Sequence, residues 1–520
     1  MLRLAMAIVL AAALPLAAQQ SSGTISGTVT DAQDAVVVGA QVEVANQDTG
    51  AVFRTRSNEQ GNYIAPGMAV GRYEVRATMS GFKTAVRSGI VLQVNQNAKV
   101  NLVLQVGQIV ESVEVSAQAA LVDTGSATLG QVVENRRVQE LPLNGRSALA
   151  LTLMTAGVMS NSGSTQSGFG DRGIGLSSIS INGGPNSMNA QMLDGNNNTL
   201  VYIGEAGVPP AVDAVEEFKV QSGTMSAEYG FTAGGSVNLV TKSGTNNWHG
   251  TLYEFLRNDK FDARNTYAKS KLPLRYNQFG GSLGGPIIKN KTFGFFNFEE
   301  YLLRKSTPRI ATTPISTWRS GNYSNWLNAS GALVPVYDPA TLRPNPNGSG
   351  QVRDQFPGNI VPTSRFDPVA AKIMTYWPTP NATPTNAFTQ SNNYQDASAN
   401  NTDWNQIHAK VDHRFSDSNS LFVRYTHAEH NPTGNSIFTD KTIGPDRVDD
   451  QTNRNAVVSD THIFSPTLIN NLRVGISRQA FVFQAINAGQ GWPAKLGFAP
   501  IVPQDQMPDI SFGFGNIGGG

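Results

Sequence analysis

The sequence has 520 residues, of which 39 are Lys or Arg and 38 are Asp or Glu, so its net charge is +1. A charge balance this close to zero argues against a nucleic-acid-binding protein, which normally carries a basic surplus. The chain contains no cysteine, and this excludes disulfide scaffolds, thiolate zinc sites and cysteine nucleophiles. Its length allows about three or four domains.

Residues 1–18 are predicted to be a secretory signal peptide. Arg3 supplies the positive start, an apolar run extends from Leu4 to Leu16, and small residues then precede a polar stretch. A helix over this run would span about 20 Å, which is less than the roughly 30 Å hydrocarbon core of a membrane. We therefore expect an exported chain that enters a membrane, if at all, without helices.

Residues 22–106 are predicted to form a small β-sandwich, because alternating runs recur roughly every 8–12 residues between turn residues. The strands are expected over residues 24–30, 40–45, 73–78 and 98–104. Four motifs in this order resemble the carboxypeptidase regulatory-like domain: Ser26–Asp31, Gly61–Tyr63, Gly71–Val75 and Ser80–Phe82. The resemblance implies a seven-stranded, transthyretin-like sandwich of the carbohydrate-binding-like superfamily.

This module is predicted to be non-catalytic. A zinc carboxypeptidase holds its metal with a His and a Glu three residues apart and a second His. None of the six histidines is followed three positions later by Glu, and none precedes position 249. A spacer or docking role is favoured over a glycan-binding site, because no cluster of aromatic residues marks a sugar platform.

Residues 107–130 are interpreted as a linker with one alternating segment. By itself this segment is a potential strand that could pair with any open sheet edge, and a first strand of the following domain is an alternative interpretation. The segment consists of Glu111, Ser112, Val113, Glu114, Val115, Ser116 and Ala117.

Residues 131–247 are predicted to form a mixed α/β domain. A short helix is expected over residues 131–141, and a second helix capped by Ser147 is expected to stop near Gly157. Strands are expected over residues 178–182 and 189–193. Asp194 begins a partial calcium-loop spacing, but Thr199 stands where that loop requires Gly, so we interpret the segment as an Asn-rich turn.

The second half of this domain carries the most specific motifs of the sequence. They resemble the plug of a TonB-dependent outer-membrane receptor, and the order of the domains most resembles the Oar-like transporters. The motifs are Glu140–Arg146, Met192–Gly195, Ala214–Val220, Ser226–Gly230, Gly234–Gly244 and, beyond the plug, Gly280–Pro286. In this context residues 111–117 resemble a TonB box, the segment that a periplasmic energy-coupling protein captures by strand addition.

Residues 248–520 are predicted to form strands of an antiparallel transmembrane β-barrel. In the clearest hairpin, over residues 405–414 and 421–429, aliphatic residues and tyrosine alternate with charged and polar residues, as a strand between lipid and lumen requires. On one face we place Ile407, Ala409, Val411, Leu421, Val423 and Tyr425, and on the other His408, Lys410, Asp412, Arg414, Phe422, Arg424 and Thr426. A soluble sandwich with one wet face would show the same alternation.

Further strands are expected over residues 293–298 and 468–476. The aromatic residues of the first, with Tyr301, suit either an interfacial girdle or a packed strand. The long polar region 306–401 suggests an extracellular loop, because periplasmic turns of such barrels are short. About ten or eleven strands fit into residues 248–520, whereas the resemblance implies about 22. We therefore expect an incomplete barrel, from a truncated product or the amino-terminal portion of a longer receptor.

The fold class expected is thus mainly β: sandwich, plug and incomplete barrel. The leading hypothesis is a TonB-dependent outer-membrane receptor that takes up a large nutrient of siderophore, glycan or peptide type. Its partners would be a TonB-type periplasmic energy-coupling protein, outer-membrane lipid and the nutrient, with no nucleic acid. No catalytic, cofactor-binding or metal-binding residues are predicted. The alternatives are a non-enzymatic surface, export or adhesion component and, third, a secreted soluble hydrolase.

Overall fold

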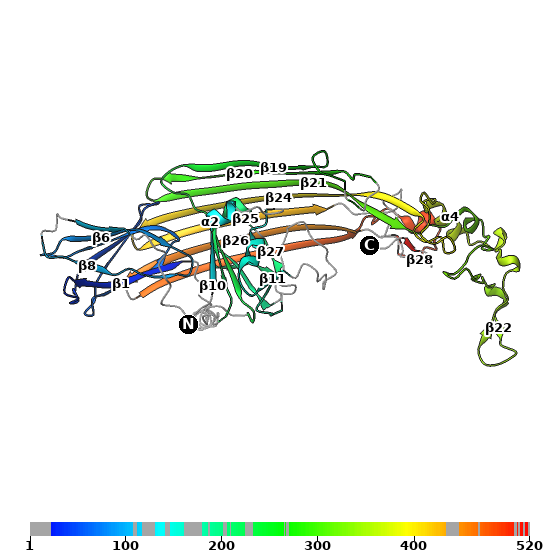
Figure 1. The fold of residues 1–520 in the computed structure, drawn as a ribbon, viewed down its shortest axis with the longest axis horizontal. Helices are drawn as coiled ribbons and strands as arrows, with labels where there is room; N and C mark the ends of the chain where they lie inside the picture. Colours follow the sequence, from blue (N-terminus) through cyan, green and yellow to red (C-terminus); the bar gives the residue numbers. More distant parts are fainter. Residues whose placement is uncertain are drawn as a thin grey trace, which may run out of the picture.

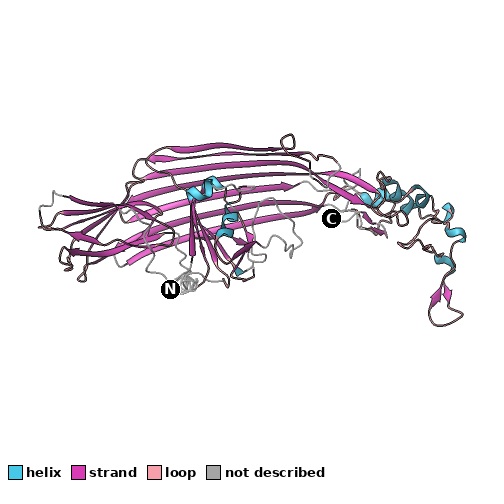
Figure 2. Ribbon diagram, viewed as in Figure 1, coloured by secondary structure: helices cyan, strands magenta, loops and turns pink. Residues whose placement is uncertain are grey.

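The computed structural model describes residues 22–107, 112–116, 130–140, 146–160, 179–185, 188–200, 205–208, 210–223, 232–264, 266, 270–432, 447–465, 468–503, 507, 510–512 and 515–517. Seven long strands run side by side along the molecule (Figure 1). A small sandwich lies at one end of them, a lobe with short helices lies at the other, and a compact domain lies against their middle (Figure 2). Within the described ranges, no helix has the length and apolar character needed to cross a membrane. The predicted signal peptide lies outside these ranges.

The sandwich is built from eight strands within residues 23–104. They are β1 (Gly23–Asp31), β2 (Gln41–Asn46), β3 (Val52–Arg56), β4 (Asn62–Met68), β5 (Gly71–Thr78), β6 (Thr84–Leu92), β7 (Asn97–Lys99) and β8 (Leu102–Leu104). One sheet has the order β4-β1-β7, with β8 also paired to β1, and the other begins β3-β2-β5-β6. Alternate side chains such as Ile25, Val42, Val75 and Leu104 are fully buried between the sheets. This is the alternation on which the sandwich prediction depended.

The expected strand over residues 98–104 is in fact two strands. Both β7 and β8 pair in parallel with β1, on either side of Val100 and Asn101. The Asn101 side chain accepts a hydrogen bond from the Thr28 amide at 3.1 Å, and the Val100 carbonyl lies so close to Gly27 that a Cβ there would be 1.9 Å away. This local crossing interrupts the ladder, and the sandwich therefore has eight strands where seven were implied.

The compact domain that follows, which we call the plug, has a five-stranded sheet of order β10-β17-β18-β13-β14, in which β13 and β18 are parallel and the other pairs antiparallel. Its core includes Leu149, Ile181, Phe218 and Leu239. The elements are β10 (Gly130–Glu134), α2 (Asn135–Glu140), η1 (Ala148–Met154), β11 (Val158–Ser160), β12 (Ile179–Ile181), β13 (Ala190–Leu193), β14 (Asn196–Asn197), β15 (Thr199–Leu200), β16 (Glu205–Ala206), η3 (Val212–Ala214), β17 (Val215–Gln221) and β18 (Ser236–Thr241).

Several local predictions in this domain need correction. The helix expected over residues 131–141 begins as strand β10, because pairing with β17 recruits the β-branched Val132 and Val133. The second helix is a 3-10 helix, and Ser147 makes no side-chain capping bond. Strand β12 pairs with β11, so it is not joined to β13 in a hairpin. The motif over residues 226–230 lies outside the described residues.

The long sheet, which we call the wall, consists of seven strands paired antiparallel in chain order. They are β19 (His249–Asn258), β20 (Leu274–Ile288), β21 (Thr292–Ala311), β24 (Tyr394–Ser416), β25 (Asn419–Pro432), β26 (Arg447–Ser465) and β27 (Leu468–Ala485). The wall is not closed, since β19 and β27 are its edges within the described residues. The predicted hairpin corresponds to β24 and β25, which are longer than expected.

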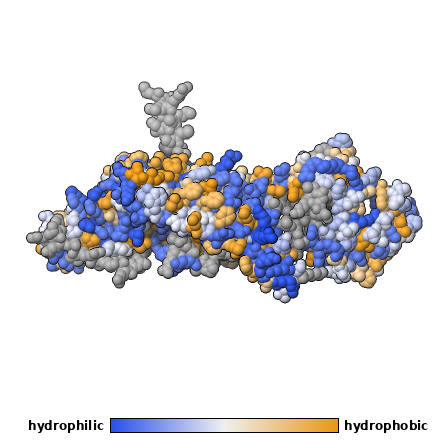
Figure 3. Space-filling model, turned by 90° about the horizontal axis from the view of Figure 1, so that it is seen from above, coloured by the Kyte–Doolittle hydropathy of each residue, from blue (hydrophilic) through white to orange (hydrophobic). Residues whose placement is uncertain are grey.

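The two faces of the wall differ as the alternation predicts. His408 and Arg424 are fully buried on the face that covers the plug, whereas Ile407 and Val423 are exposed on the outer face. Seen from above, apolar residues form patches on the surface (Figure 3). The aromatic strand β21 uses both faces: Phe295 is buried towards the plug and Phe296 is exposed. The fold-class prediction is therefore confirmed.

The strand count differs from the prediction, since residues 248–520 form seven wall strands within the described part of the chain rather than ten or eleven. The reason is strand length, because β24 alone has 23 residues. A polar lobe connects β21 to β24 and contains α3 (Ser316–Arg319), η4 (Pro339–Thr341), β22 (Arg343–Pro344), β23 (Gln351–Val352), η5 (Pro357–Asn359), η6 (Thr363–Arg365) and α4 (Pro368–Tyr376). Ile373 and Trp377 of this lobe pack against Trp492 and Leu496 of α5 (Trp492–Leu496). A last small pair is β28 (Ile510–Phe512) and β29 (Gly515–Ile517).

Candidate functional site

The first part of the site is an ion cluster between the plug and the wall. Asp194, at the turn between β13 and β14, points its carboxylate at two wall cations: Arg424 Nε lies 2.8 Å from Oδ2, and Lys410 Nζ lies 3.6 Å from Oδ1. All three side chains are at least 93% buried. Thr241 donates to the same carboxylate from its amide at 2.9 Å and from its hydroxyl at 2.7 Å. The carboxylate is thus neutralised inside the wall by groups from β18, β24 and β25.

This environment sets the charge of Asp194. Burial by itself would raise the pKa of the carboxyl, but Lys410, Arg424 and the Thr241 hydrogen bonds outweigh burial, and the net pKa lies below its usual value. Asp194 and Gly195 adopt positive φ angles of 50° and 71°, as a tight turn requires. The interpretation of this segment as a turn agrees with this geometry. The carboxylate of Asp194 forms ion pairs with Arg424 and Lys410 of the protein itself.

A second ion cluster surrounds Arg146, the last residue of the motif Glu140–Arg146. Its guanidinium forms an ion pair with Asp213 of η3 and lies 3.7 Å from Glu299 of β21. The guanidinium carbon also lies 4.6 Å from the ring centre of Tyr253 and 4.3 Å from that of Phe255, both on β19. Tyr253 donates to Glu299 at 2.7 Å. Arg146 therefore joins a plug acid, a wall acid and two wall aromatics in one contact.

Apolar contacts complete the plug–wall interface. Phe295 of β21 packs against Ala211 and Ala214 of the plug. Further along, the plug residue Val208 packs among aromatic wall residues that include Tyr301 and Trp404, whose rings are stacked with centroids 6.2 Å apart. The aromatics of β21 thus act as a packing surface for the plug on one of their two faces.

The sandwich also contacts the plug, through the turn between β6 and β7. The fully buried Val94 donates its amide hydrogen to the Glu217 carboxylate of β17. Lys219 Nζ donates to the Asn95 carbonyl at 3.0 Å. Burial raises the pKa of Glu217 to about 8, and the nearby Glu134 and Glu216 add to the rise. Glu217 and Lys219 belong to the plug motif Ala214–Val220, but nothing in the sequence indicated Val94 and Asn95 of the sandwich as their partners.

The sandwich is anchored to the wall as well, at its short turns. Arg54 of β3 forms an ion pair with Asp417 at 2.5 Å, and the Asn246 amide donates to the Asp48 carbonyl at 3.0 Å. Ile463 of β26 packs against the sandwich core. The sandwich therefore lies at the end of the wall where the connections are shortest, opposite the polar lobe (Figure 1).

The candidate coupling segment forms a strand. Ser112–Ser116 make up β9, which pairs in parallel with β6 and is the last strand of the order β3-β2-β5-β6-β9. Glu111 and Ala117 lie outside the described residues. The structure thus brings the segment to the sandwich, and it does not make it a strand of the plug sheet.

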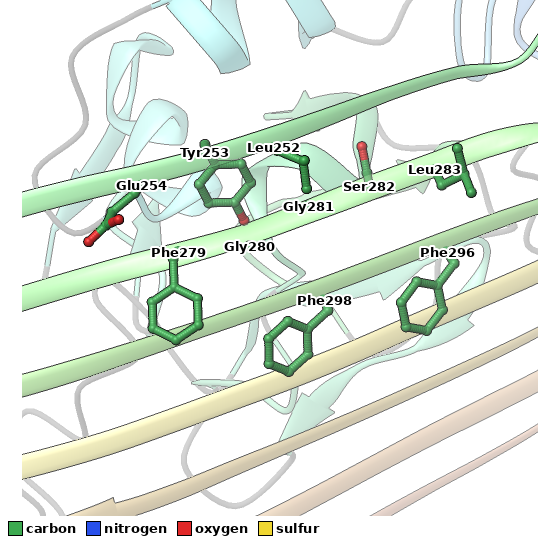
Figure 4. Close-up of a pocket in the computed structure, with 10 residues that line it drawn as sticks. All are labelled: Leu252, Tyr253, Glu254, Phe279, Gly280, Gly281, Ser282, Leu283, Phe296 and Phe298. Atoms are coloured by element: carbon green, nitrogen blue, oxygen red, sulfur yellow. The ribbon is translucent and has the colours of Figure 1, made fainter.

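A groove of about 740 Å³ lies along β19, β20 and β21. The rings of Phe279, Phe296 and Phe298 lie in a row beside it (Figure 4). A Cβ on Gly281 would lie 2.6 Å from Leu252 Cδ2, so only glycine lets Leu252 pack at this position. The exposed Phe296 and Leu252 belong to the outer face of the wall. The groove is therefore largely an apolar feature of that face, although Tyr253, which contacts Arg146 of the plug, also lines it.

The chain is similar to known outer-membrane proteins. The family model described as "Outer membrane beta barrel domain" matches residues 240–520, which is more than half of the chain. The chain belongs to the outer membrane beta barrel domain family. A second family model, "Carboxypeptidase regulatory-like domain", matches residues 24–105. Both matches confirm the resemblances drawn from the motifs.

Among curated proteins, the TonB-dependent transporter Oar of Myxococcus xanthus is 27% identical to this chain over 299 residues. The match covers 54% of the chain and 27% of Oar. Two solved structures are similar in fold. The outer membrane transporter YddB from Escherichia coli has a TM-score of 0.39 and 11% identity over 66% of this chain and 38% of YddB. A mutant of the ferric enterobactin receptor PfeA from Pseudomonas aeruginosa has a TM-score of 0.36 and 14% identity over 67% of this chain and 40% of the receptor.

The Oar match shows homology to a TonB-dependent transporter, and the family model shows an outer-membrane barrel domain. The chain covers less than half the length of each of these proteins.

Proposed function

We propose that this protein acts in TonB-dependent uptake of a large nutrient across the outer membrane, with the wall as part of the pore and the plug as its gate. The observation that carries the proposal is the buried contact of plug Asp194 with wall Arg424 and Lys410. A gate must be held in the lumen when closed and must also be able to leave. A buried ion pair suits this role because its charges compensate each other while the plug is in place, and each charge regains its hydration when the plug is released.

The proposal includes the division of the chain. Residues 1–18 serve as a cleaved signal peptide, residues 22–106 as the sandwich, residues 107–130 as the linker with the coupling segment, residues 131–247 as the plug, and residues 248–520 as barrel. The protein is not an enzyme in this proposal. Its partner is a TonB-type periplasmic energy-coupling protein, which captures residues 111–117 by strand addition and draws the plug aside.

The nutrient belongs to the siderophore, glycan or peptide class. It would first meet the polar lobe between β21 and β24, which lies at the end of the wall away from the sandwich. Ile373 and Trp377 of this lobe share a small apolar core with Trp492 and Leu496 of α5, so the lobe can present a stable binding surface.

Deletion of residues 111–117 tests the proposal. Energy-dependent uptake is expected to stop, while the amount of protein in the outer membrane and its surface exposure stay unchanged. A surface-anchoring or export component would keep its activity in this deletion, and that result would overturn the proposal. Arg54→Ala is a suitable control, because it removes a sandwich–wall ion pair without touching the segment.

A further inference from the structure

The strand β9 occupies the edge of the five-stranded sandwich sheet, and within the described residues no strand pairs with its other edge. We propose that the sandwich presents β9 as an ordered edge strand, onto which an extended strand of the periplasmic coupling protein adds as the sixth strand of that sheet. The inference rests on the proposed function, because it takes residues 111–117 as the coupling segment. It gives the sandwich a role in coupling that is distinct from binding a glycan.

The pairing of β9 leaves half of its backbone groups available. Five residues pair in register, from Thr84 with Ser112 to Ser88 with Ser116. Successive N–H and C=O groups of a strand point to opposite edges, so β6 engages one set and the other set faces outwards. An open edge of this kind is a template for another strand. The segment contains no proline, and Glu114 is its only charge within residues 112–116, so little opposes strand addition.

β9 pairs with the first half of β6, and the burial pattern of this half differs from that of the second half. Thr84, Ala85 and Val86 are buried in succession, whereas the second half of the strand alternates between buried and exposed residues. Gly89, with a φ of 75°, separates the two halves at a register shift between β5 and β6. Burial of consecutive residues means that both faces of the sheet are covered at this place. β9 therefore pairs with the part of β6 that is covered on both faces.

A short tether keeps β9 at this edge. The Lys83 amide donates to the Gln105 carbonyl at 2.7 Å, and the Gly107 amide donates to the Gly81 carbonyl at 3.2 Å. The chain therefore leaves the sandwich beside the start of β6, and only residues 108–111 separate Gly107 from β9. A connection of this length holds the segment at a high effective concentration near its site.

Presentation in this form favours capture by a partner. A free peptide loses backbone conformational entropy residue by residue when it becomes a strand, and this loss lowers its affinity. A strand that is already ordered on β6 has lost that entropy before the partner arrives, so the same backbone hydrogen bonds give tighter binding. Addition to the open edge also breaks none of the β6–β9 pairs.

A disulfide between β6 and β9 tests the inference in the full-length protein. Ala85 and Val113 are register partners, and the chain has no native cysteine, so Ala85→Cys/Val113→Cys gives one defined crosslink. The probe is the purified periplasmic domain of the TonB-type coupling protein. We expect the oxidised protein to bind this domain as tightly as the reduced protein, or more tightly. A loss of about tenfold or more on oxidation, reversed by reduction, would overturn the inference, because β9 would then have to leave the sandwich.

Two controls separate the possible failures. The pair Thr84→Cys/Ser116→Cys is four residues out of register and should not crosslink; equal crosslinking would show that β9 does not dock in the described register and would overturn the inference. If the crosslinkable variant fails to bind in both the oxidised and the reduced state, as the chain lacking residues 111–117 is expected to fail, then residues 111–117 are not the coupling segment and the proposed function is wrong. Loss only in the oxidised state would place the failure in presentation by the sandwich.

The open edge is tested by proline in the locked protein. Glu114→Pro and Val115→Pro each remove one N–H, and neighbouring N–H groups point to opposite edges. We expect one of the two variants to lose binding of the coupling domain by about tenfold or more, while the other, whose N–H faces β6, retains it because the disulfide holds β9 in place. Equal binding by both variants and the locked parent would overturn the inference.

Discussion

The Asp194 carboxylate of the plug and the Arg424 guanidinium of the wall meet at 2.8 Å, with both side chains removed from solvent. The two residues are 230 positions apart in the chain, on elements that share no sheet. Arg424 also donates to the Leu193 carbonyl at 3.2 Å and to the Asn455 side chain at 2.7 Å. One wall residue thus holds both the side chain and the backbone of the plug turn.

Replacement of Arg424 by methionine is expected to weaken the hold of the wall on the plug by about 3 kcal/mol, because removal of one partner leaves a buried charge uncompensated. The value falls at the low end of the range for buried pairs, since Lys410 still lies near Asp194. Protease cleavage of the plug in detergent-solubilised protein measures the effect, and Arg424→Met should be cleaved much faster than the wild type.

The half-exposed pair of Arg304 and Asp403 on the same wall provides the matched control. Arg304→Met should change cleavage little, because exposed ion pairs contribute about 0–1 kcal/mol. The double variant Asp194→Asn/Arg424→Met should lose less than the sum of the two single changes, because the two side chains contact each other directly. A double variant as weak as the sum of the two single changes would contradict a direct contact.

Arg146→Lys tests the second cluster. Lysine keeps the positive charge but loses the planar fork that contacts Asp213 and lies over Tyr253 and Phe255. We expect a loss of about 1–2 kcal/mol in plug–wall stability. Hydrogen exchange of η3 measures it, and the exposed plug residue Arg137 serves as the control site for the same substitution. Unchanged exchange in Arg146→Lys would show that charge alone makes this contact.

The contact between Glu217 and Val94 is expected to depend on pH. Burial raises the pKa of Glu217 to about 8 in the docked state; the Val94 hydrogen bond and Lys219 oppose this rise, and Glu216 and Glu134 add to it. Undocking exposes the carboxyl and returns its pKa towards about 4.3, so the docked state binds the proton more tightly. Docking of the sandwich is therefore strongest at low pH, and it weakens as the pH rises through about 8.

Spin labels at Val91→Cys and Glu140→Cys, on the sandwich and the plug, measure this change as a distance distribution in an otherwise cysteine-free chain. The distribution should broaden with rising pH in the labelled wild type and become nearly independent of pH in Glu217→Gln, which cannot ionise. Glu74→Gln on the sandwich surface should behave like the wild type. A pH response that survives in Glu217→Gln would assign the titration to another group.

A charged residue placed on the outer face of the wall should destabilise the folded protein in a membrane. Leu472, Val474 and Ile476 of β27 are exposed apolar residues at alternate positions. Val474→Arg is expected to destabilise the protein folded in lipid vesicles by about 2–4 kcal/mol, the cost of a lipid-facing arginine near the bilayer midplane. Asn471→Arg, on the opposite face of the same strand, should cost far less in the same urea titration. Equal costs would mean that β27 does not face lipid.

The sequence by itself determined which side chains share a face. In β24 and β25, the alternation of Ile407 and His408, and of Val423 and Arg424, assigned the exposed and buried faces correctly, because the two-residue period of a strand is a local property. The motif order likewise identified the carboxypeptidase regulatory-like sandwich and the resemblance to the Oar transporter. Local periodicity was less reliable where pairing decided the outcome, as in β10, where a helix was expected.

Only the tertiary structure decided which faces meet. The alternation placed Arg424 and Lys410 inside the wall, but nothing in the sequence near them indicates Asp194 as their partner. The same holds for β9, whose alternating sequence suits any open sheet edge and whose place beside β6 depends on where the sandwich leaves that edge free. Strand pairing and buried ion pairs depend on groups brought together from distant parts of the chain. A local pattern carries no information about which of these distant groups meet.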